Sequence, residues 1–377
     1  MRGSEGMRNA DLRALVDGFA GARIAVVGDL VADEYLYGET DRISREAPVL
    51  IVRYEDSEVH LGCGANAAAN VAALGARVFP VGLVGDDAVG ERLRGMLRGM
   101  GADLAGVIVV PGRPTATKTR ILAGGKNTRR QQMLRIDRDG PGVVPSALLG
   151  KLLRAVKDAA EQADAVLVSD YGLGTLSEPV IESVLALASR GKIVCADARY
   201  GIAQYRGVTL VKPNEVELEQ AVGRHLGGDP AALEDAGREL LRTCRARVLL
   251  VTRGRAGMML LRANGPTVVL PAHGTAAAVD VTGAGDTVIA TATVALAASA
   301  DPVQAARVAN VAGALVILKP GTATVSPAEL RRELSRGDVA RPETLEEPAL
   351  PATGGGRRPQ YTEESRAEPS RRRRARR

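Results

Sequence analysis

Short apolar, β-branched segments alternate along the chain with longer amphipathic segments. The apolar segments predict strands at residues 23–27, 78–84, 165–169, 192–196, 209–212, 247–251 and 267–270. The amphipathic segments predict helices at 65–74, 88–100, 146–162, 179–189, 215–222, 231–242 and 302–317, and an Ala/Val/Thr-rich segment predicts a buried helix at 287–300. This alternation is typical of a doubly wound α/β fold, in which helices cover both faces of a mostly parallel sheet.

Two stretches interrupt the alternation. Residues 35–59 and 108–137 combine β-branched residues with many charges. We expect them to form extra strands outside the main sheet, as a small lid over a binding site. Residues 1–20 are interpreted as an N-terminal extension and 21–337 as the folded domain. The Pro, Gly, Glu and Arg content of 338–377 is typical of a disordered tail.

Composition excludes several classes of protein. The three cysteines and three histidines are scattered, so neither a disulfide framework nor a histidine metal cluster is expected. No run of 18 apolar residues occurs and the N-terminus lacks an apolar signal segment, so we expect a cytoplasmic protein without a membrane span. The net charge of +6 comes from six arginines among the last eight residues. Nucleic-acid binding is not expected of the domain, since aromatic residues for base stacking make up only 2%.

Polar residues follow five of the predicted strands. They are Asp29, Asp170, Asp197, Asn214 and the run Thr252-Arg253-Gly254. Any one of them could be a helix cap or a turn residue. Ligands bind outside the carboxyl ends of parallel strands, so together these residues indicate one polar crevice.

The stretch from Asp280 to Asp286 precedes the predicted buried helix. Backbone amides of Gly283, Ala284 and Gly285 could converge on an anion there, because a helix N-terminus also carries positive potential. Asp286 would stand beside that anion, where it could take a proton from an attacking hydroxyl. An anion cradle with a base is what phosphoryl transfer to an alcohol requires. A simple glycine turn is the alternative.

Asn214 and Glu217 lie three residues apart at a predicted helix start. They could form a capping box, or they could hold a hydrated Mg²⁺ beside a phosphate. Residues 62–67 fit the pattern G-x-G-x-x-A of a dinucleotide fingerprint, but they do not follow the first strand. We prefer a glycine turn that brings backbone and Asn66 close to a sugar, and a helix start without a ligand remains open.

Basic residues occur at regular intervals in the predicted lid. Lys118, Arg120 and Arg135 could clamp a phosphate on the substrate, since arginine forks match phosphate geometry. A charged strand edge that prevents aggregation is an equal alternative.

These motifs together resemble the ribokinase/PfkB family of ATP-dependent sugar kinases, over about residues 20 to 335. The two family signatures correspond to residues 62–76 and 280–292. Within the family, the chain is most similar to the D-glycero-β-D-manno-heptose-7-phosphate kinases. That similarity lies in residues 28–52, 113–122, 131–137, 169–176, 205–217, 251–258, 280–291 and 321–327.

The resemblance implies a ribokinase-like fold, the cofactors ATP and Mg²⁺, and a product that is a sugar 1,7-bisphosphate for ADP-heptose synthesis. A K⁺ ion near Asp280 and the loop around residue 320 is also compatible with the family. The resemblance also implies that Asp286 is the base, that Mg²⁺ is held through water, and that lid strands pair in a homodimer. Sugar hydroxyls would contact Asp33, Gly62, Gly64 and Asn66. The nucleotide would contact Asn214, Glu217, Thr252, Arg253, Gly254, Gly257, Asn310 and Gly321.

The chain departs from the family pattern at three places. Cys63 replaces the second glycine of a pair, and residues 171–174 and 197–201 each lack a lysine that the family has. Another sugar or nucleoside kinase of the family is therefore an alternative, and a sugar-phosphate sensor without catalytic activity is a second one.

Overall fold

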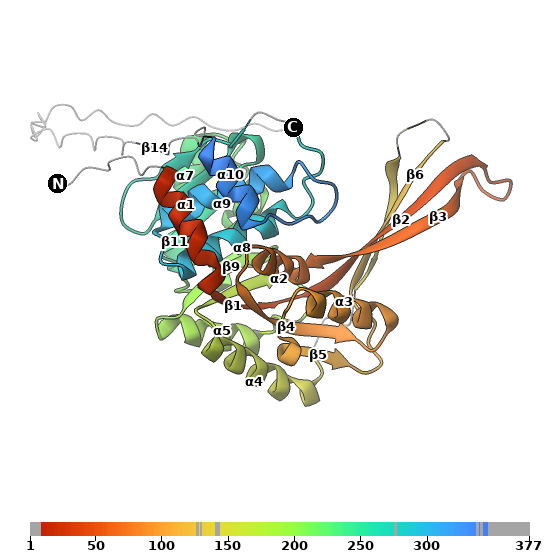
Figure 1. Ribbon diagram of the computed structural model, residues 1–377, viewed down its shortest axis with the longest axis horizontal. Helices are drawn as coiled ribbons and strands as arrows, with labels where there is room; N and C mark the ends of the chain where they lie inside the picture. Colours follow the sequence, from red (N-terminus) through yellow and green to blue (C-terminus); the bar gives the residue numbers. More distant parts are fainter. Residues whose placement is uncertain are drawn as a thin grey trace, which may run out of the picture. The chain divides into compact units, whose positions relative to one another are not determined.

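Figure 1 presents a computed structural model of the chain, which describes residues 9–125, 128, 130–139, 144–274, 277–336, 339 and 342–345. Its main sheet has the strand order β14-β13-β12-β11-β10-β9-β8-β1-β4-β5. The bounds are β1 (Arg23–Gly28), β4 (Arg77–Gly85), β5 (Val107–Val110), β8 (Ala165–Asp170), β9 (Ile193–Ala198), β10 (Leu210–Val211), β11 (Val248–Thr252), β12 (Met258–Arg262), β13 (Val268–Leu270) and β14 (Glu343–Thr344).

Neighbouring strands are parallel from β5 through β11 and antiparallel from β11 to β14. The mostly parallel sheet predicted from the sequence is confirmed. Val26 of β1 pairs with Pro80 of β4 on one side and with Leu167 of β8 on the other. Later strands are therefore added to the sheet on both sides of β1. The strand order reverses there, and doubly wound sheets bind ligands at such a switch point.

Three elements differ from the prediction. Val107–Val110 was expected in the lid, but it pairs with β4 in the main sheet. Strand β12, a hydrophobic run after a glycine turn, was not predicted at all. Glu343–Thr344 falls in the segment interpreted as a disordered tail, yet it pairs with β13. The remainder of that tail, from residue 346 onward, lies outside the described residues.

A second sheet has the order β3-β2-β6-β7, and we call these four strands the lid. They are β2 (Leu30–Ile43), β3 (Leu50–Cys63), β6 (Thr117–Gly124) and β7 (Gln131–Arg138). Figure 1 shows β2 and β3 running side by side, as their antiparallel pairing requires. Because β2 begins two residues after the last residue of β1, the lid starts at the carboxyl edge of the main sheet.

The helices divide between the two faces of the main sheet. One face is covered by α1 (Asn9–Asp17), α2 (Gly64–Ala73), α3 (Ala88–Gly99), α8 (Ala284–Ala297), α9 (Pro302–Val316) and α10 (Pro327–Ser335). The other is covered by α4 (Ser146–Gln162), α5 (Glu178–Ser189), α6 (Glu215–Val222) and α7 (Pro230–Cys244). Successive β1 residues enter opposite cores, Ile24 the first and Ala25 the second. Strands buried on both faces explain the continuous apolar runs in the sequence.

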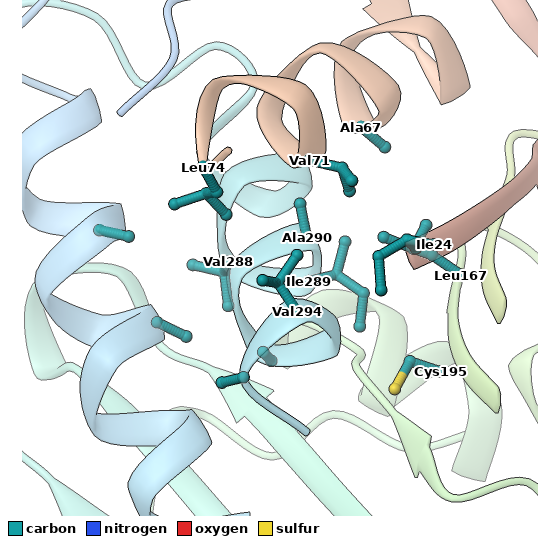
Figure 2. Close-up of a cluster of buried hydrophobic side chains, with 14 of the residues drawn as sticks. Ile24, Ala67, Val71, Leu74, Leu167, Cys195, Val288, Ile289, Ala290 and Val294 are labelled. Carbon is teal, nitrogen blue, oxygen red and sulfur yellow. The ribbon is translucent and has the colours of Figure 1, made fainter. Parts of the chain in front are cut away.

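Helix α8 is the centre of the first core. Figure 2 shows Ile289 and Ala290 of α8 in one cluster with Val71 of α2 and Leu167 of β8. Val288 faces α9, since a Cβ on Gly313 would lie 3.0 Å from its Cγ2. Small residues on α8 let these neighbours approach, and the helix is buried along most of its length. It begins at Ala284, three residues before the predicted start. Among the described residues, no helix combines the length and apolar character needed to cross a bilayer.

Candidate active site

The N-terminus of α8 opens at the carboxyl edge of the sheet. Gly283 is its N-cap, with a left-handed φ of 78°, and a Cβ there would lie 2.6 Å from Nδ2 of Asn66. Only glycine fits both the dihedral and the close approach. First-turn amides of a helix have no partner within the helix, so they are available to an anion. The N–H of Ala284 is the exception, because it already donates to the carbonyl of Val281 at 3.2 Å.

Asp286 lies in the first turn of α8 and is 3% exposed. Its Oδ2 accepts a hydrogen bond from Nδ2 of Asn66 at 2.8 Å, and its Oδ1 accepts one from the Tyr171 hydroxyl at 3.1 Å. Burial raises the pKa of the Asp286 carboxyl to about 7, although the bond from Asn66 works in the opposite direction. A carboxylate with that pKa can accept and release a proton near neutral pH.

An ion pair that the sequence analysis did not identify lies beside the cradle. Nζ of Lys212 is 2.9 Å from Oδ2 of Asp197, and the two side chains are 4% and 11% exposed. A Cβ added to Gly285 would lie 3.4 Å from the Lys212 nitrogen. Burial raises the pKa of Asp197 to about 6, although Lys212 opposes that rise. The signal in the sequence was a lysine that ends a predicted strand two residues before Asn214.

The segment after Asp197 lacks the lysine that the family has, and Lys212 reaches Asp197 from the end of the neighbouring strand β10. Arg199, a basic residue in that segment that could substitute for the missing lysine, has an exposed side chain.

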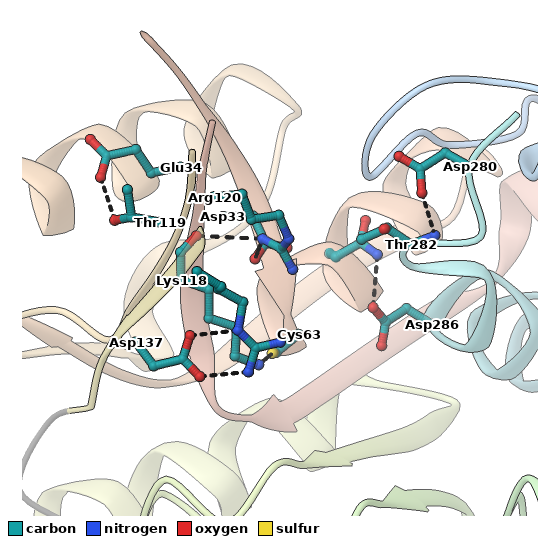
Figure 3. Close-up of polar contacts among 12 residues, drawn as sticks. Asp33, Glu34, Cys63, Lys118, Thr119, Arg120, Asp137, Asp280, Thr282 and Asp286 are labelled. Atoms are coloured by element: carbon teal, nitrogen blue, oxygen red, sulfur yellow. Dashed lines mark hydrogen bonds and ion pairs between the residues drawn. The ribbon is translucent and has the colours of Figure 1, made fainter. Parts of the chain in front are cut away.

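The lid directs several charged residues toward the cradle (Figure 3). Arg120 forms an ion pair with Asp33 at 2.6 Å, and its guanidinium lies 5.4 Å from the ring centroid of Tyr35. Nζ of Lys118 lies 3.2 Å from Sγ of Cys63 and 4.8 Å from the ring centroid of Tyr171. Lys118 and Arg120 alternate on β6 and therefore share one face of the lid.

Arg135 is opposite Arg120 in the strand register, so it lies on the same face. It is paired with Asp137 through two hydrogen bonds of 2.7 and 2.6 Å. The structure therefore brings the three predicted clamp residues together. Arg120 and Arg135 thus pair with carboxylates, whereas Lys118 contacts Cys63 and Tyr171.

Close packing requires the two glycines at the start of α2. A Cβ on Gly62 would lie 2.7 Å from Oδ2 of Asp33, and one on Gly64 would lie 2.9 Å from the carbonyl oxygen of Asp29. The segment follows a lid strand and not the first strand of the main sheet, which excludes the dinucleotide fingerprint. Asn66 is fully buried and turned toward Asp286.

Asp29 is bound to backbone amides, whereas residues after the strands were expected to line a polar crevice. It is 2% exposed, and its carboxylate accepts hydrogen bonds from the N–H groups of Tyr171, Leu173 and Thr175. Asp29 therefore holds the loop that carries Tyr171 to Asp286. In this loop, Leu173 stands where the family has a lysine, and it packs against a small apolar cluster.

Asn214 and Glu217 form a complete capping box at the start of α6. Oδ1 of Asn214 accepts from the Glu217 N–H at 2.8 Å, and Oε2 of Glu217 accepts from the Asn214 N–H at 2.9 Å. The cap does not exclude a metal role, because each carbonyl or carboxylate oxygen has a second lone pair. Within the described ranges, no group of three or more His, Cys, Asp or Glu could hold a metal ion directly. This donor set fits only a cation that keeps most of its waters, as Mg²⁺ does.

The remaining predicted nucleotide residues lie on loops around the carboxyl edge. Thr252 forms a parallel bridge with Asn214, which places β11 beside the start of α6. Arg253 pairs with Glu215 at 2.8 Å. Gly254 and Gly257 have left-handed φ angles of 52° and 84°, as a tight turn after β11 requires.

Two more of the predicted nucleotide residues, Asn310 and Gly321, form hydrogen bonds with other residues of the chain. Asn310 donates to the carbonyl oxygen of Pro271 at 2.7 Å, and the Gly321 N–H donates to Asp280 at 3.0 Å.

The Tyr35 hydroxyl and Oγ1 of Thr322 are buried and have no hydrogen-bond partner among the described residues. Buried hydroxyls usually have a partner, so these two fit contact with a polar ligand.

Comparisons with known proteins identify related sequences and structures. The family described as "pfkB family carbohydrate kinase" matches residues 22–329. "Bifunctional protein HldE" of Nitrobacter winogradskyi is 42% identical over 328 residues, covering 86% of this chain and 66% of that protein. The Caulobacter vibrioides protein of the same name is 43% identical over 316 residues, covering 83% and 63%. The aligned part of the chain thus spans about two thirds of these relatives.

Solved structures share the fold. Arabidopsis thaliana ribokinase complexed with ribose and ATP has a TM-score of 0.67 and 22% identity, covering 83% of this chain and 98% of that one. Escherichia coli phosphofructokinase-2 in complex with substrates and products has a TM-score of 0.67 and 18% identity, covering 84% and 99%. At these identities the likeness establishes a ribokinase-like α/β fold.

Proposed function

The chain belongs to the pfkB family of carbohydrate kinases, and on that premise we propose that it transfers the γ-phosphoryl group of ATP to a sugar phosphate. The substrate we propose is D-glycero-β-D-manno-heptose 7-phosphate, and the product is the 1,7-bisphosphate that serves ADP-heptose synthesis. The relatives at about 40% identity and the heptose-kinase segments of the sequence support this substrate.

The observation that carries the proposal is the placement of Asp286. It is a buried carboxylate at a helix N-terminus, with a pKa of about 7 and with the Lys212 ion pair beside the same turn. Asp286 accepts the proton of the anomeric hydroxyl while the sugar oxygen forms a bond to the γ-phosphorus. The bond from that phosphorus to the β,γ-bridging oxygen breaks, and ADP leaves. Lys212 and the amides around Gly283 and Gly285 stabilise charge on the transferring group.

Asn214 and Glu217 would hold Mg²⁺ through water, on the side of the site where Glu217 acts electrostatically on Lys212 and Asp197. Bound Mg²⁺ neutralises charge on the nucleotide phosphates. We place the K⁺ ion near Asp280 and the loop that contains Gly321. The buried, unpartnered hydroxyl of Thr322 fits an oxygen ligand there.

For the nucleotide, we propose contacts with the loops that surround the cradle on the α6 and α9 side. The residues are Thr252, Arg253, Gly254, Gly257, Asn310 and Gly321. For the sugar, we propose Asp33, Asn66 and the backbone at Gly62 and Gly64. Lys118, Arg120 and Arg135 would bind the substrate's own phosphate, since all three occupy the lid face that carries Asp33.

The opposite face of the lid supports a homodimer. Alternation along the strands places Leu36, Ile121, Leu134 and Ile136 on that face, and Leu134 and Ile136 are 55% and 51% exposed. An apolar sheet face of this kind is typical of an interaction surface. We propose that a second copy of the lid covers it.

The test is turnover by the wild-type protein and Asp286→Asn over a panel of sugars, sugar phosphates and nucleosides. We expect heptose 7-phosphate to give the highest kcat/KM. The Asn variant should bind ATP but turn over about 10²–10⁴-fold more slowly, since it cannot accept the proton. Near-normal turnover by Asp286→Asn contradicts the base role. Preference for another sugar or a nucleoside reassigns the substrate, and absence of turnover with every acceptor supports a sensor.

A further inference from the structure

Three buried polar side chains form a chain of hydrogen bonds that ends at Asp286. Oγ1 of Thr287 lies 2.8 Å from Oδ1 of Asn70, and Nδ2 of Asn70 lies 3.1 Å from Oδ1 of Asn66. Nδ2 of Asn66 then donates to Oδ2 of Asp286 at 2.8 Å. Asn66, Asn70 and Thr287 are each 0–1% exposed, so water does not compete for these groups.

Each bond in the chain has a defined direction. An ionised carboxylate only accepts, so the NH₂ group of Asn66 must face Asp286 and its oxygen must face away. That oxygen accepts from the NH₂ group of Asn70. The oxygen of Asn70 accepts in turn from the single hydroxyl proton of Thr287 at 2.8 Å, which is closer than the other acceptor of that proton, the Gly283 carbonyl at 3.3 Å. Turning the Asn66 amide around would oppose like atoms at both of its contacts, and turning the Asn70 amide would oppose oxygen to oxygen at both of its contacts with Asn66.

The spacing on the two helices produces this arrangement. Asn66 and Asn70 are four residues apart on α2, so they share one face of that helix. Thr287 follows Asp286 directly on α8, and α2 packs against α8 in the first core. The Asn70 NH₂ group also donates to the backbone oxygen of Asn66 at 2.9 Å, which further restrains its amide.

We propose that Asn70 and Thr287 are positioning residues, which hold Asn66 with its NH₂ group on Asp286 and thereby keep the base aligned and ionised for proton transfer. The proposal rests on the proposed role of Asp286 as the base. Neither Asn70 nor Thr287 reaches a substrate, because both are sealed between α2 and α8. They act on the reaction only through Asn66.

Other charged or titratable groups also face Asp286. Tyr171 donates to its Oδ1 from the loop after β8, and Lys212 and Asp197 act on it from the ends of β10 and β9. Cys63 is near it from the residue before α2. All of these remain in place when Asn70 or Thr287 is changed. A shift in the pH dependence of those variants therefore reports on the chain through Asn66.

The test compares Thr287→Val with Thr291→Val. Both threonines are buried on α8, but the Thr291 hydroxyl donates only to the Thr287 carbonyl of its own helix, at 2.7 Å. We expect Thr287→Val to lower kcat at pH 7 by about tenfold, as loss of support for one hydrogen bond to a charged group implies. The acid limb of its kcat profile should move upward by about half to one pH unit, with the KM for ATP unchanged. Thr291→Val should keep the wild-type profile.

Asn70→Asp tests the direction of the chain. The new carboxylate can accept from Thr287 but cannot donate to Asn66, so it draws the Asn66 NH₂ group away and turns its oxygen toward Asp286. We expect a kcat loss of up to about 100-fold and a larger upward move of the acid limb. If Asn70→Asp does not fold, the comparison of Thr287→Val with Thr291→Val still tests the proposal.

Thr287→Val and Thr291→Val profiles that both match the wild type, or that both shift equally, overturn the proposal. Those results leave the kinase function intact, provided that turnover still depends on Asp286. An Asp286→Asn variant with normal turnover overturns the proposed function together with this inference.

Discussion

Lys212 and Asp197, from the ends of adjacent parallel strands, form an ion pair of 2.9 Å that is almost closed to water and lies beside Gly285. Desolvation opposes burial of two charges, so such a pair is weak evidence for stability alone. Its position at the N-terminus of α8 gives it a second role. There the ammonium group adds positive charge to the turn where a transferring phosphoryl group would lie.

Removing only the Lys212 ammonium should lower the free energy of unfolding more than removing the charges of both Lys212 and Asp197. We expect Lys212→Met to lower the free energy of unfolding by about 3–5 kcal/mol, because it leaves Asp197 buried and unpaired. The double variant Lys212→Met/Asp197→Asn should recover most of that loss and yet remain poorly active. Chemical denaturation measures the first effect and kcat the second. A double variant with wild-type kcat would show that the Lys212 charge has no part in the reaction.

The pH dependence of stability should report on Asp286. Because burial raises the folded-state pKa to about 7, above the ordinary value of 3.8, the folded state binds the proton more tightly than the unfolded state does. Stability from this group is therefore complete below about pH 4 and is lost as pH rises toward 7. Asp286→Asn removes the titration, so its free energy of unfolding should exceed that of the wild type by up to about 4 kcal/mol above pH 7.

Denaturation of both proteins at pH 5 and pH 8 measures this difference. The gain from Asp286→Asn should be larger at pH 8. A gain that is equal at both pH values would contradict the raised pKa of Asp286.

The lid arginines offer a matched pair for substrate recognition. Arg120→Ala should raise the KM for the sugar phosphate by about tenfold or more while the KM for ATP changes little, since a charge-assisted contact to phosphate is lost. The control is Arg130→Ala, directly before β7, whose guanidinium pairs with Glu55 and lies over the ring of Tyr37. Initial rates with each substrate varied give both KM values. An unchanged sugar KM in Arg120→Ala would remove it from the phosphate clamp.

The outer lid face predicts the oligomeric state. Ile136→Lys should convert a dimer into a monomer, because a charge placed in an apolar interface must be desolvated without a partner. Met100→Lys is the control, since Met100 is a similarly exposed apolar residue at the end of α3, outside the lid. Sedimentation or light scattering at several concentrations distinguishes the species. A wild-type protein that is monomeric throughout would exclude the lid interface.

Much of the fold was predictable because its signals are local. Apolar runs such as 165–169 and 247–251 are long enough and β-branched enough to be identified as strands without knowledge of their neighbours. Local signals also explain why Val107–Val110 was assigned to the wrong sheet. Four apolar residues predict a strand, but they carry no information about the strand with which they will pair. Helix α8 begins earlier than expected because glycines disfavour helices locally, whereas the structure includes Gly285 in the first turn of the helix.

The sequence by itself determined the alternating elements, the glycine-flanked helix start and the carboxylate in its first turn, because each depends on residues close together in the chain. Only the tertiary structure decided which side chains surround that carboxylate. Asn66 is 220 residues away from Asp286 and Tyr171 is 115 away. Their meeting depends on the strand order and on the packing of α2 against α8. No local periodicity contains that information, since hydrogen bonds between distant residues form only after the sheet has brought its strand ends to one edge.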